Sequence, residues 1–434
     1  MTPTIAVLII FLVTCAALIA LVFAKPSVMI GGKKVSIFWL APLAGALALV
    51  IGGFITPAEI ATGLTGAGDV NPLKILLLFF SMTMMSVYLD EIGFFRLLAH
   101  KVLSKAKGSQ LTLFFLLYGL VSILTVFTSN DIIVLTFTPF ICHFAKSARI
   151  DPLPYLVSEF VAANTWSMAL IIGNPTNIYL VTAAGGSFLP YVKVMLLPTL
   201  AAGAIAFGCL FLLFRKKLRD PIKAAPEEVV LEDKFSLWVG IVHLVVCTVL
   251  LAIGSYLNIE MWLVSFLSAI SLFIWCIGIA IFRKRKPTTL VACLKRAPWE
   301  LIPFILSMFV MVEALSANQV TDAIYGLLGS DMPVWKYGIT SFLACNLINN
   351  IPMSVLYSSI LPSTASEAAV YATVVGSNLG ACLTPIGALA GIMWSSILKT
   401  HGLKFGYLDF LKIGVSIAIP ALLAALGVLQ IIYL

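Results

Sequence analysis

The sequence predicts an all-α polytopic membrane protein, and three observations support this fold class. The chain of 434 residues is 61% hydrophobic and 11% charged, with a mean hydropathy of +1.08, whereas soluble domains carry about 25% charged residues. Apolar runs of about 20 residues recur along the whole chain, and a helix of that length crosses the ~30 Å hydrocarbon layer. The charged residues gather in the loops between these runs.

About ten transmembrane helices are expected from the apolar runs. Two further segments, 111–145 and 337–361, are predicted to form re-entrant helical hairpins, because their second arms, 132–145 and 351–361, are too short to cross the membrane. The predicted spans lie near 4–24, 35–54, 73–89, 152–184, 189–214, 235–256, 259–282, 299–316, 366–398 and 408–433.

The basic residues predict the orientation of the chain in the membrane. With the N- and C-termini outside, all 27 Lys and Arg residues except Lys74, Lys193 and Lys336 fall on the cytoplasmic side, as the positive-inside rule requires. We therefore expect a multi-pass protein of the plasma (inner) membrane. The same distribution accounts for the net charge of +8, so no nucleic-acid partner is expected.

Two halves of the chain repeat the same signals in the same order. Residues 1–214 form the first half, 215–234 a polar cytoplasmic linker, and 235–434 the second half. The halves start on opposite sides of the membrane in the predicted topology, so we expect inverted-topology repeats, as in many secondary transporters. The repeated signals are "FFSMTMM" (79–85) with "ILSMFVM" (305–311), Asn130-Asp131 with Asn349-Asn350, and the nine-residue spacing of Asn164 and Gly173 with that of Asn378 and Gly387.

Two of the predicted helices are expected to be interrupted. "GNPTN" (173–177) lies within 152–184, and "TPIG" (384–387) lies within 366–398. Proline lacks a backbone donor and clashes with the preceding turn, so it frees carbonyl groups that cannot face lipid. Transporters built from inverted repeats bind their substrate at mid-membrane, beside such interrupted helices. The sequence therefore predicts the binding site at these two breaks and the hairpin tips.

Motifs in the second half resemble the arsenical pump membrane protein family, the ArsB-type arsenite-efflux permeases. They are "NNIPMSVLYSSIL" (349–361), "YATVVGSNLGACLTPIGALAGIMW" (371–394) and "GYLDFLKIG" (406–414). The first half, with "SNDIIVLTFTPF" and "GNPTNIYL", resembles the wider ion transporter superfamily, which includes sodium/proton antiporters and sodium-coupled di- and tricarboxylate carriers. The resemblance implies inverted repeats with two re-entrant hairpins. For the arsenical branch it implies proton-driven efflux of arsenite and antimonite, sometimes with a cytoplasmic ATPase subunit.

Asp131 is the predicted coupling residue. It lies in "TSNDIIVLTFTPF" (128–140), and it is the single Asp, Glu, Lys or Arg residue between 111 and 145. An ionised carboxylate at the bilayer centre costs roughly 2.5–3.5 kcal/mol, which favours the uptake of a proton. Asp131 is therefore a candidate to load and release the coupling proton. The alternative is that it caps the helix that begins at Ile132.

The other predicted binding residues flank the hairpin tips and the helix breaks. Their amides and hydroxyls can bind substrate or an ion, or they can cap helices and form interhelical hydrogen bonds. No Lys or Arg occurs in 111–145, 152–184 or 337–398, which favours a neutral trihydroxide such as arsenous acid over a multivalent anion. The complete predicted set is Ser129, Asn130, Asp131, Asn164, Asn174, Thr176, Asn177, Asn349, Asn350, Asn378 and Thr384.

Enzymatic and cofactor-dependent functions are not expected. "GAGD" (66–69) matches the GxGD of intramembrane aspartyl proteases but lies in a polar loop, and "GGKK" (31–34) lacks the spacing of a phosphate-binding loop. The eight cysteines show no metal-ligand spacing. Glu159 and Glu313 are interpreted as partner or interface charges, with a part in coupling as the alternative. The rival function is a sodium-coupled carrier of organic or inorganic anions, or a sodium/proton antiporter; a homodimer is possible.

Overall fold

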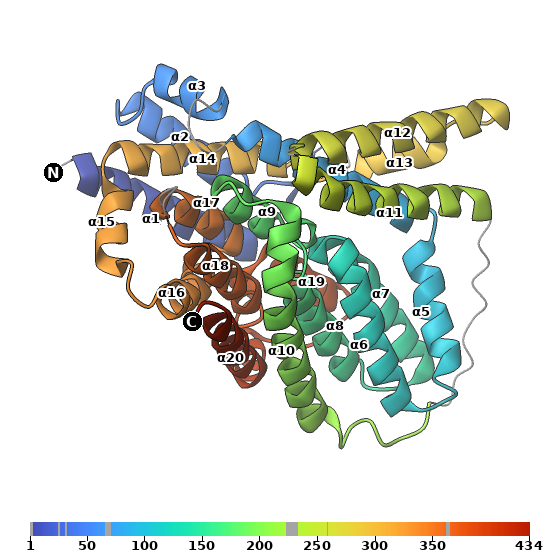
Figure 1. Cartoon of the computed structure of the whole chain (residues 1–434). Coiled ribbons are helices and arrows are strands. Elements are labelled where there is room, and N and C mark those ends of the chain that lie inside the picture. Colours follow the sequence, from blue (N-terminus) through green and yellow to red (C-terminus); the bar gives the residue numbers. More distant parts are fainter. Residues whose placement is uncertain are drawn as a thin grey trace.

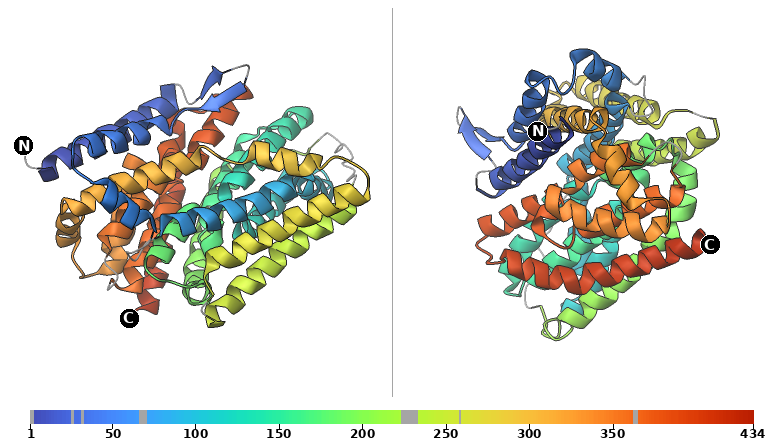
Figure 2. Two further views of the ribbon diagram at one scale, coloured as in Figure 1. Left: turned by 90° about the horizontal axis from the view of Figure 1, so that it is seen from above. Right: turned by 90° about the vertical axis from the view of Figure 1, so that its left-hand side faces the viewer.

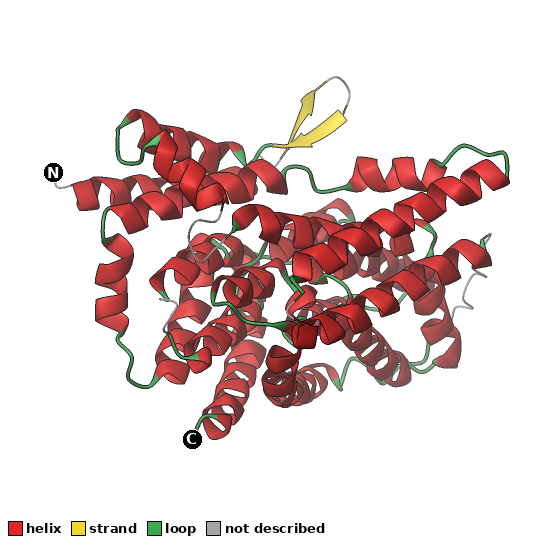
Figure 3. Ribbon diagram, turned by 45° about the horizontal axis from the view of Figure 1, so that its top comes forward, coloured by secondary structure: helices red, strands yellow, loops and turns green. Residues whose placement is uncertain are grey.

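The structure is a computed structural model that describes residues 3–24, 27–30, 33–65, 71–222, 233–257, 259–361 and 365–434. The prediction of an all-helical membrane protein is confirmed, since nine helical segments among these residues are long and apolar enough to cross a membrane. One antiparallel hairpin of two short strands, which the sequence analysis did not predict, stands beside the helices (Figure 3). The "GAGD" segment and linker residues 223–232 lie outside the described residues.

The first half of the chain begins with a long helix and ends with another (Figure 1). Its elements are α1 (Pro3–Ala24), β1 (Ser27–Ile30), β2 (Lys33–Ser36), α2 (Leu40–Ile51), α3 (Pro57–Thr65), α4 (Pro72–Glu91), α5 (Phe94–Lys105), α6 (Gln110–Phe127), α7 (Asn130–Ala148), α8 (Leu153–Trp166), the 3-10 turn η1 (Ile171–Gly173), α9 (Pro175–Ala183) and α10 (Phe188–Phe214).

The second half has as many described helices as the first, again with a 3-10 turn between its eighth and ninth helices. Its elements are α11 (Lys234–Leu257), α12 (Met261–Phe282), α13 (Thr288–Arg296), α14 (Leu301–Ala317), α15 (Val320–Leu328), α16 (Pro333–Ile348), α17 (Asn350–Ile360), α18 (Glu367–Gly380), η2 (Pro385–Gly387), α19 (Leu389–Thr400) and α20 (Tyr407–Ile432). We propose that the halves are repeats, and their inverted topology stays a prediction.

Reciprocal contacts join the two halves. The hairpin arm α7 packs against α19, and the corresponding arm α17 packs against α9. The long helices α10 and α20 pack against each other across the molecule, as the views in Figure 2 also show. Each half thus packs a hairpin arm against the interrupted helix of the other, and most residues of the hairpin tips and helix breaks are buried.

Several boundaries differ from those expected. The apolar run 35–54 forms only the 12-residue helix α2, because its first residues belong to strand β2. The second hairpin arm in the first half, expected over 132–145, is the 19-residue helix α7, which is long enough to cross a membrane. Pro139 lies inside α7 without ending it. The arm α17 is short, at 11 residues, and the depth of both hairpins stays a prediction.

Both predicted helix breaks are present. In the first, α8 ends at Trp166 and α9 begins at Pro175, with Asn174 accepting a hydrogen bond from the Thr176 backbone N–H at 3.1 Å. Gly173 allows the chain to fold back here, because a Cβ at this position would lie 2.3 Å from the Ser167 carbonyl oxygen. The second break separates α18 from α19 in the same way.

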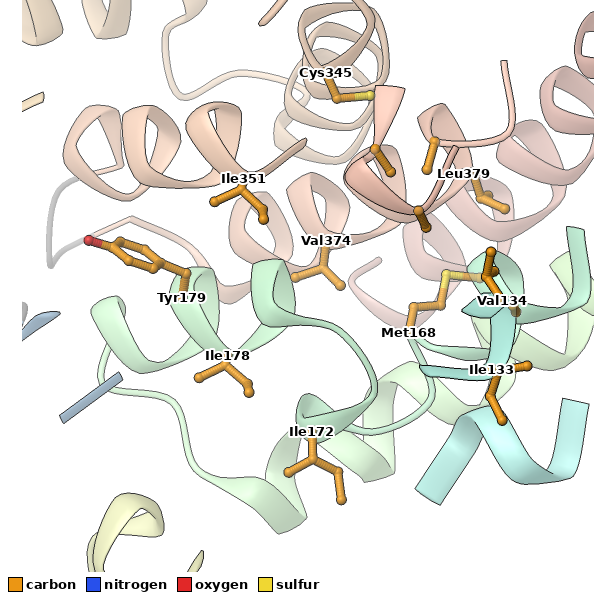
Figure 4. Packing of buried hydrophobic residues seen from close by; sticks show 14 of the residues in the cluster. Ile133, Val134, Met168, Ile172, Ile178, Tyr179, Cys345, Ile351, Val374 and Leu379 are labelled. Carbon is orange, nitrogen blue, oxygen red and sulfur yellow. The ribbon is translucent and has the colours of Figure 1, made fainter. Parts of the chain in front are cut away.

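Apolar side chains from both halves fill the space between the breaks. Figure 4 shows Val134 of α7 beside Met168 of the first break, with Leu379 of α18 close by. Ile351 and Val374 of the second half lie across the same cluster from Ile178 of α9. All of these residues are buried, so this core holds the hairpin tips against the interrupted helices.

Candidate functional site: hairpin tips and helix breaks

The first hairpin tip exposes a carboxylate that has no partner. Helix α6 ends at Phe127, and Ser129 is the extended N-cap residue of α7, without a side-chain cap hydrogen bond. Asp131 lies in the first turn of α7, where a negative charge is favoured by the helix dipole. It is half-buried, and its carboxylate forms no hydrogen bond or ion pair with the described residues. This geometry gives no support to the alternative that Asp131 is a capping residue.

The second hairpin tip is strained. Asn349 joins α16 to α17 with φ 74° and ψ 153°. Residues other than glycine rarely adopt this backbone conformation, which costs them about 1–3 kcal/mol. The Asn349 amide donates to the Ile386 carbonyl oxygen at 2.8 Å and accepts from the Ile351 backbone N–H at 3.3 Å. The first bond ties the tip to η2, and the second caps the start of α17. Strain held in place by its surroundings is common at binding sites.

Asn378 is the centre of a buried hydrogen-bonded cluster. Its amide oxygen accepts from Ser167 Oγ at 2.8 Å and from Asn174 Nδ2 at 2.9 Å, and its Nδ2 donates to Asn177 Oδ1 at 2.6 Å. These bonds join α18 of the second half to the break in the first half. All four side chains are 1% exposed or less. Because their hydrogen bonds are made within the protein, the cluster acts here as interhelical support.

Asn164 links the first tip to the interrupted helix. Its Oδ1 accepts from Asn130 Nδ2 at 3.1 Å, and its own Nδ2 donates to the Phe160 carbonyl oxygen at 2.9 Å. The Oδ1 of Asn130 in turn accepts from the Asp131 backbone N–H at 2.9 Å. Asn130 and Asn164 therefore fix the position from which the Asp131 carboxylate projects.

Asn346 belongs to the site and was missed in the sequence analysis. Its Nδ2 donates to the Gly380 carbonyl oxygen at 3.0 Å, and its Oδ1 accepts from Thr384 Oγ1 at 2.6 Å. It closes the second break as Asn177 closes the first, where Asn177 Nδ2 donates to the Ser167 and Leu170 carbonyl oxygens. An amide within the apolar run of α16 was the available signal.

Four polar groups at the tips and the first break have hydrogen-bonding capacity that the described residues do not use. Asp131 has no partner, and three buried oxygen atoms also lack one among the described residues: Ser129 Oγ, Thr176 Oγ1 and Asn350 Oδ1. Buried polar groups are ordinarily hydrogen-bonded, and exceptions often mark functional sites. The structure thus separates the predicted binding residues into supporting amides and groups with free hydrogen-bonding capacity.

No cation lies among these residues. The ion pairs of the described chain connect Lys74 to Glu260, Lys217 to Asp151, Arg283 to Asp233, Arg296 to Asp90 and Glu91, and Lys336 to Asp331. None of these involves a hairpin tip or a helix break. In the same described part, no three His, Cys, Asp or Glu side chains gather closely enough to hold a metal ion. The site therefore offers amides, hydroxyls and a single carboxylate.

Comparisons with known proteins agree with this architecture. A family model described as citrate transporter matches residues 28–374. The arsenical pump membrane protein of Escherichia coli (strain K12) is 27% identical over 92% of this chain and 94% of its own length. The putative arsenical pump membrane protein of Bacillus subtilis (strain 168) is also 27% identical, over 85% of this chain and 88% of its own. The resemblance to arsenical pump membrane proteins is confirmed.

Solved transporter structures share the fold. The crystal structure of the Alcanivorax borkumensis YdaH transporter aligns with a TM-score of 0.60 at 12% identity and covers 99% of this chain and 98% of its own. The structure of Neisseria gonorrhoeae MtrF aligns with a TM-score of 0.51 at 13% identity, over 99% and 95% of the two chains. At these identities the likeness concerns the fold alone.

Proposed function

This chain belongs to the citrate transporter family, a family of membrane transporters, and on that premise we propose that it exports arsenite and antimonite in exchange for protons. The broader statement, that it is a multi-pass membrane transporter of small ions or anions, rests on the family match and the relatives together. The proposal adds the substrate, the coupling ion and the direction of transport.

The unpaired carboxylate of Asp131 is the observation that carries the proposal. It lies at the tip of a hairpin, half-buried and without a cationic partner among the described residues. An uncompensated carboxylate in a membrane is costly, so Asp131 is stable there when protonated and can release the proton when water reaches it. Substrate binding that favours one protonation state then couples the two movements, because a ligand shifts an equilibrium by its difference in affinity for the two states.

The chemistry of the site supports a neutral, hydroxyl-rich substrate. Arsenous acid is uncharged near neutral pH and presents hydroxyl groups, which can donate to oxygens such as Ser129 Oγ, Thr176 Oγ1 and Asn350 Oδ1, each without a partner among the described residues. The hairpins and interrupted helices contain no Lys or Arg, so a citrate or succinate anion in this site would rely on helix N-termini and bound cations, whereas a neutral substrate needs neither. Both relatives reported above are also named arsenical pumps.

A second candidate function is sodium-coupled transport of a di- or tricarboxylate. One observation favours it: the family model that matches residues 28–374 is described as citrate transporter. Here bound sodium ions supply the missing positive charge, and Asp131 with the asparagine amides binds them. A sodium/proton antiporter is the third member of this group of alternatives.

Transport assays in everted membrane vesicles separate these functions. The full chain is expressed in a bacterial host that lacks its own arsenite efflux system, and respiration acidifies the vesicle interior. We expect radiolabelled arsenite to accumulate and a protonophore to abolish the accumulation. Sodium-dependent uptake of citrate or succinate in right-side-out vesicles, with no arsenite accumulation in everted ones, contradicts the proposal.

Further details belong to the same proposal. The N- and C-termini lie on the outer side of the plasma membrane, and the linker 215–234 lies on the cytoplasmic side. We propose that proton exchange requires neither a cytoplasmic ATPase subunit nor a second copy of the chain in a homodimer. The predicted set of binding residues stays a prediction, with Asp131, Ser129, Thr176 and Asn350 as the proposed ligand contacts.

A further inference from the structure

Glu159 is a buried carboxyl group that the predicted binding set does not include. It lies in α8, one and a half turns from the start of the helix, and its side chain is 0% exposed. Thr138 Oγ1 of α7 donates to the carboxyl group, 3.2 Å from Oε2 and 3.3 Å from Oε1. No Lys, Arg or His of the described chain pairs with it. An unpaired charge buried in this way costs several kcal/mol, so the resting group is the neutral acid.

A second hydrogen-bond donor lies near the same carboxyl group. Trp394 of α19 is its other polar neighbour, and the indole Nε1 is buried without a hydrogen bond of ordinary geometry among the described residues. The indole ring is held by Phe160 at 5.3 Å and Phe410 at 5.7 Å between ring centroids. A neutral acid accepts chiefly on its carbonyl oxygen, whereas a carboxylate has two equivalent acceptor oxygens and so can accept from both Thr138 and Trp394. The surroundings therefore suit a group that changes its charge.

Along the axis of α7, Glu159 lies at a level between Asp131 and the C-terminal end of that helix. Thr138, which marks the level of Glu159, is seven residues after Asp131, or about 10.5 Å along the helix axis at ~1.5 Å per residue. Five residues further, His143 is exposed and its ring contacts that of His401 at 4.9 Å. Cys142 of α7 is the titratable group that interacts with Glu159. Trp394 of α19 is a polar neighbour that does not titrate, and no Asp, Glu, Lys, Arg or His of the described residues adds a charge interaction with Glu159.

We propose that Glu159 is a second proton-binding group, which exchanges protons with the side of the membrane on which α7 ends. On release, the carboxyl O–H bond breaks, the proton passes to a water molecule that enters beside His143 and His401, and Thr138 and Trp394 donate to the carboxylate. On uptake, the proton returns from water to the carboxylate. The inference rests on the proposed function only in that this proton, together with the one carried by Asp131, takes part in coupling transport.

Infrared difference spectroscopy tests the proposal without any substrate. The purified full chain in proteoliposomes is stepped from acid to alkaline pH, and the C=O band of protonated carboxyl groups is recorded. Besides any band from Asp131, we expect a band that disappears as the pH rises, that is absent in Glu159→Gln at every pH, and that is retained in the matched controls Glu313→Gln and Asp131→Asn. In Thr138→Val the band should persist to higher pH, because the carboxylate loses a donor.

Two results overturn the proposal. Either the Glu159 band stays constant over the whole pH range in which circular dichroism shows folded protein, or Glu159→Gln leaves every pH-dependent carboxyl band intact. If Glu159→Gln does not fold, Glu159→Asp replaces it, and a shifted titrating band is then required. A failure of the proposed function is recognised separately, as wild-type vesicles that accumulate no arsenite while the Glu159 band still titrates.

Discussion

The hydrogen bonds of Asn378 predict that its replacement destabilises the protein more than replacement of its counterpart Asn164. In Asn378→Ala, Asn174 Nδ2 and Asn177 Oδ1 both lose their partner, while Ser167 Oγ keeps its bond to the Asn164 carbonyl oxygen. Each buried group left unsatisfied costs about 1–3 kcal/mol. The free energy of unfolding should therefore fall by about 2–6 kcal/mol.

Asn164→Ala provides the matched control. It leaves one side-chain donor, Asn130 Nδ2, without a partner, so the expected loss is about 1–3 kcal/mol. Thermal unfolding of the purified variants in one detergent, followed by circular dichroism, should rank the midpoints as wild type, then Asn164→Ala, then Asn378→Ala. Equal midpoints for Asn378→Ala and wild type, or the reverse order of the two variants, would refute the role given to this cluster.

Three further substitutions test the supporting structure. Gly173→Ala places a Cβ 2.3 Å from a backbone oxygen in the first break and should abolish stable expression, whereas Gly119→Ala, where a Cβ meets nothing within 4 Å, should express normally on an immunoblot. Arg296→Gln removes the partly exposed cation beside the buried Asp90 and should cost about 1–3 kcal/mol. Adding Asp90→Asn should restore much of the loss in the same unfolding assay. Asn349→Gly relieves the positive φ at the second tip, so its free energy of unfolding should exceed that of Asn349→Ala by about 1–3 kcal/mol, seen as a higher unfolding temperature. Equal stability of the two variants would show that the tip is unstrained.

The sequence analysis succeeded where the signal is local. A carboxylate within an apolar run marks Asp131 whatever surrounds it, and proline with glycine in "GNPTN" and "TPIG" interrupts a helix by its own backbone chemistry. The long spans were found for the same reason, because a run of about 20 apolar residues by itself indicates a membrane-spanning helix. The short helices α3, α5, α13 and α15 carry no such run and were not predicted.

Contacts between segments far apart in the chain could not be predicted from the sequence. Nothing in "NLINN" (346–350) distinguishes Asn346, which closes the second break, from Asn349 at the strained tip. The asymmetry between Asn164 and Asn378 was also hidden, because their nine-residue spacings to a glycine are identical and their partners come from different helices. Glu159 was interpreted as an interface charge, since its donor Thr138 and its neighbour Trp394 are brought to it only by packing.

The most direct test of the central claim is arsenite accumulation by Asp131→Asn in everted vesicles. The amide keeps the size of the side chain and removes its ability to carry a proton. We predict that Asp131→Asn, at wild-type abundance in the membrane, accumulates no arsenite against a gradient, while Glu313→Gln, a carboxyl group beside α3, accumulates it normally. Proton-driven accumulation by Asp131→Asn equal to that of the wild type would contradict the account.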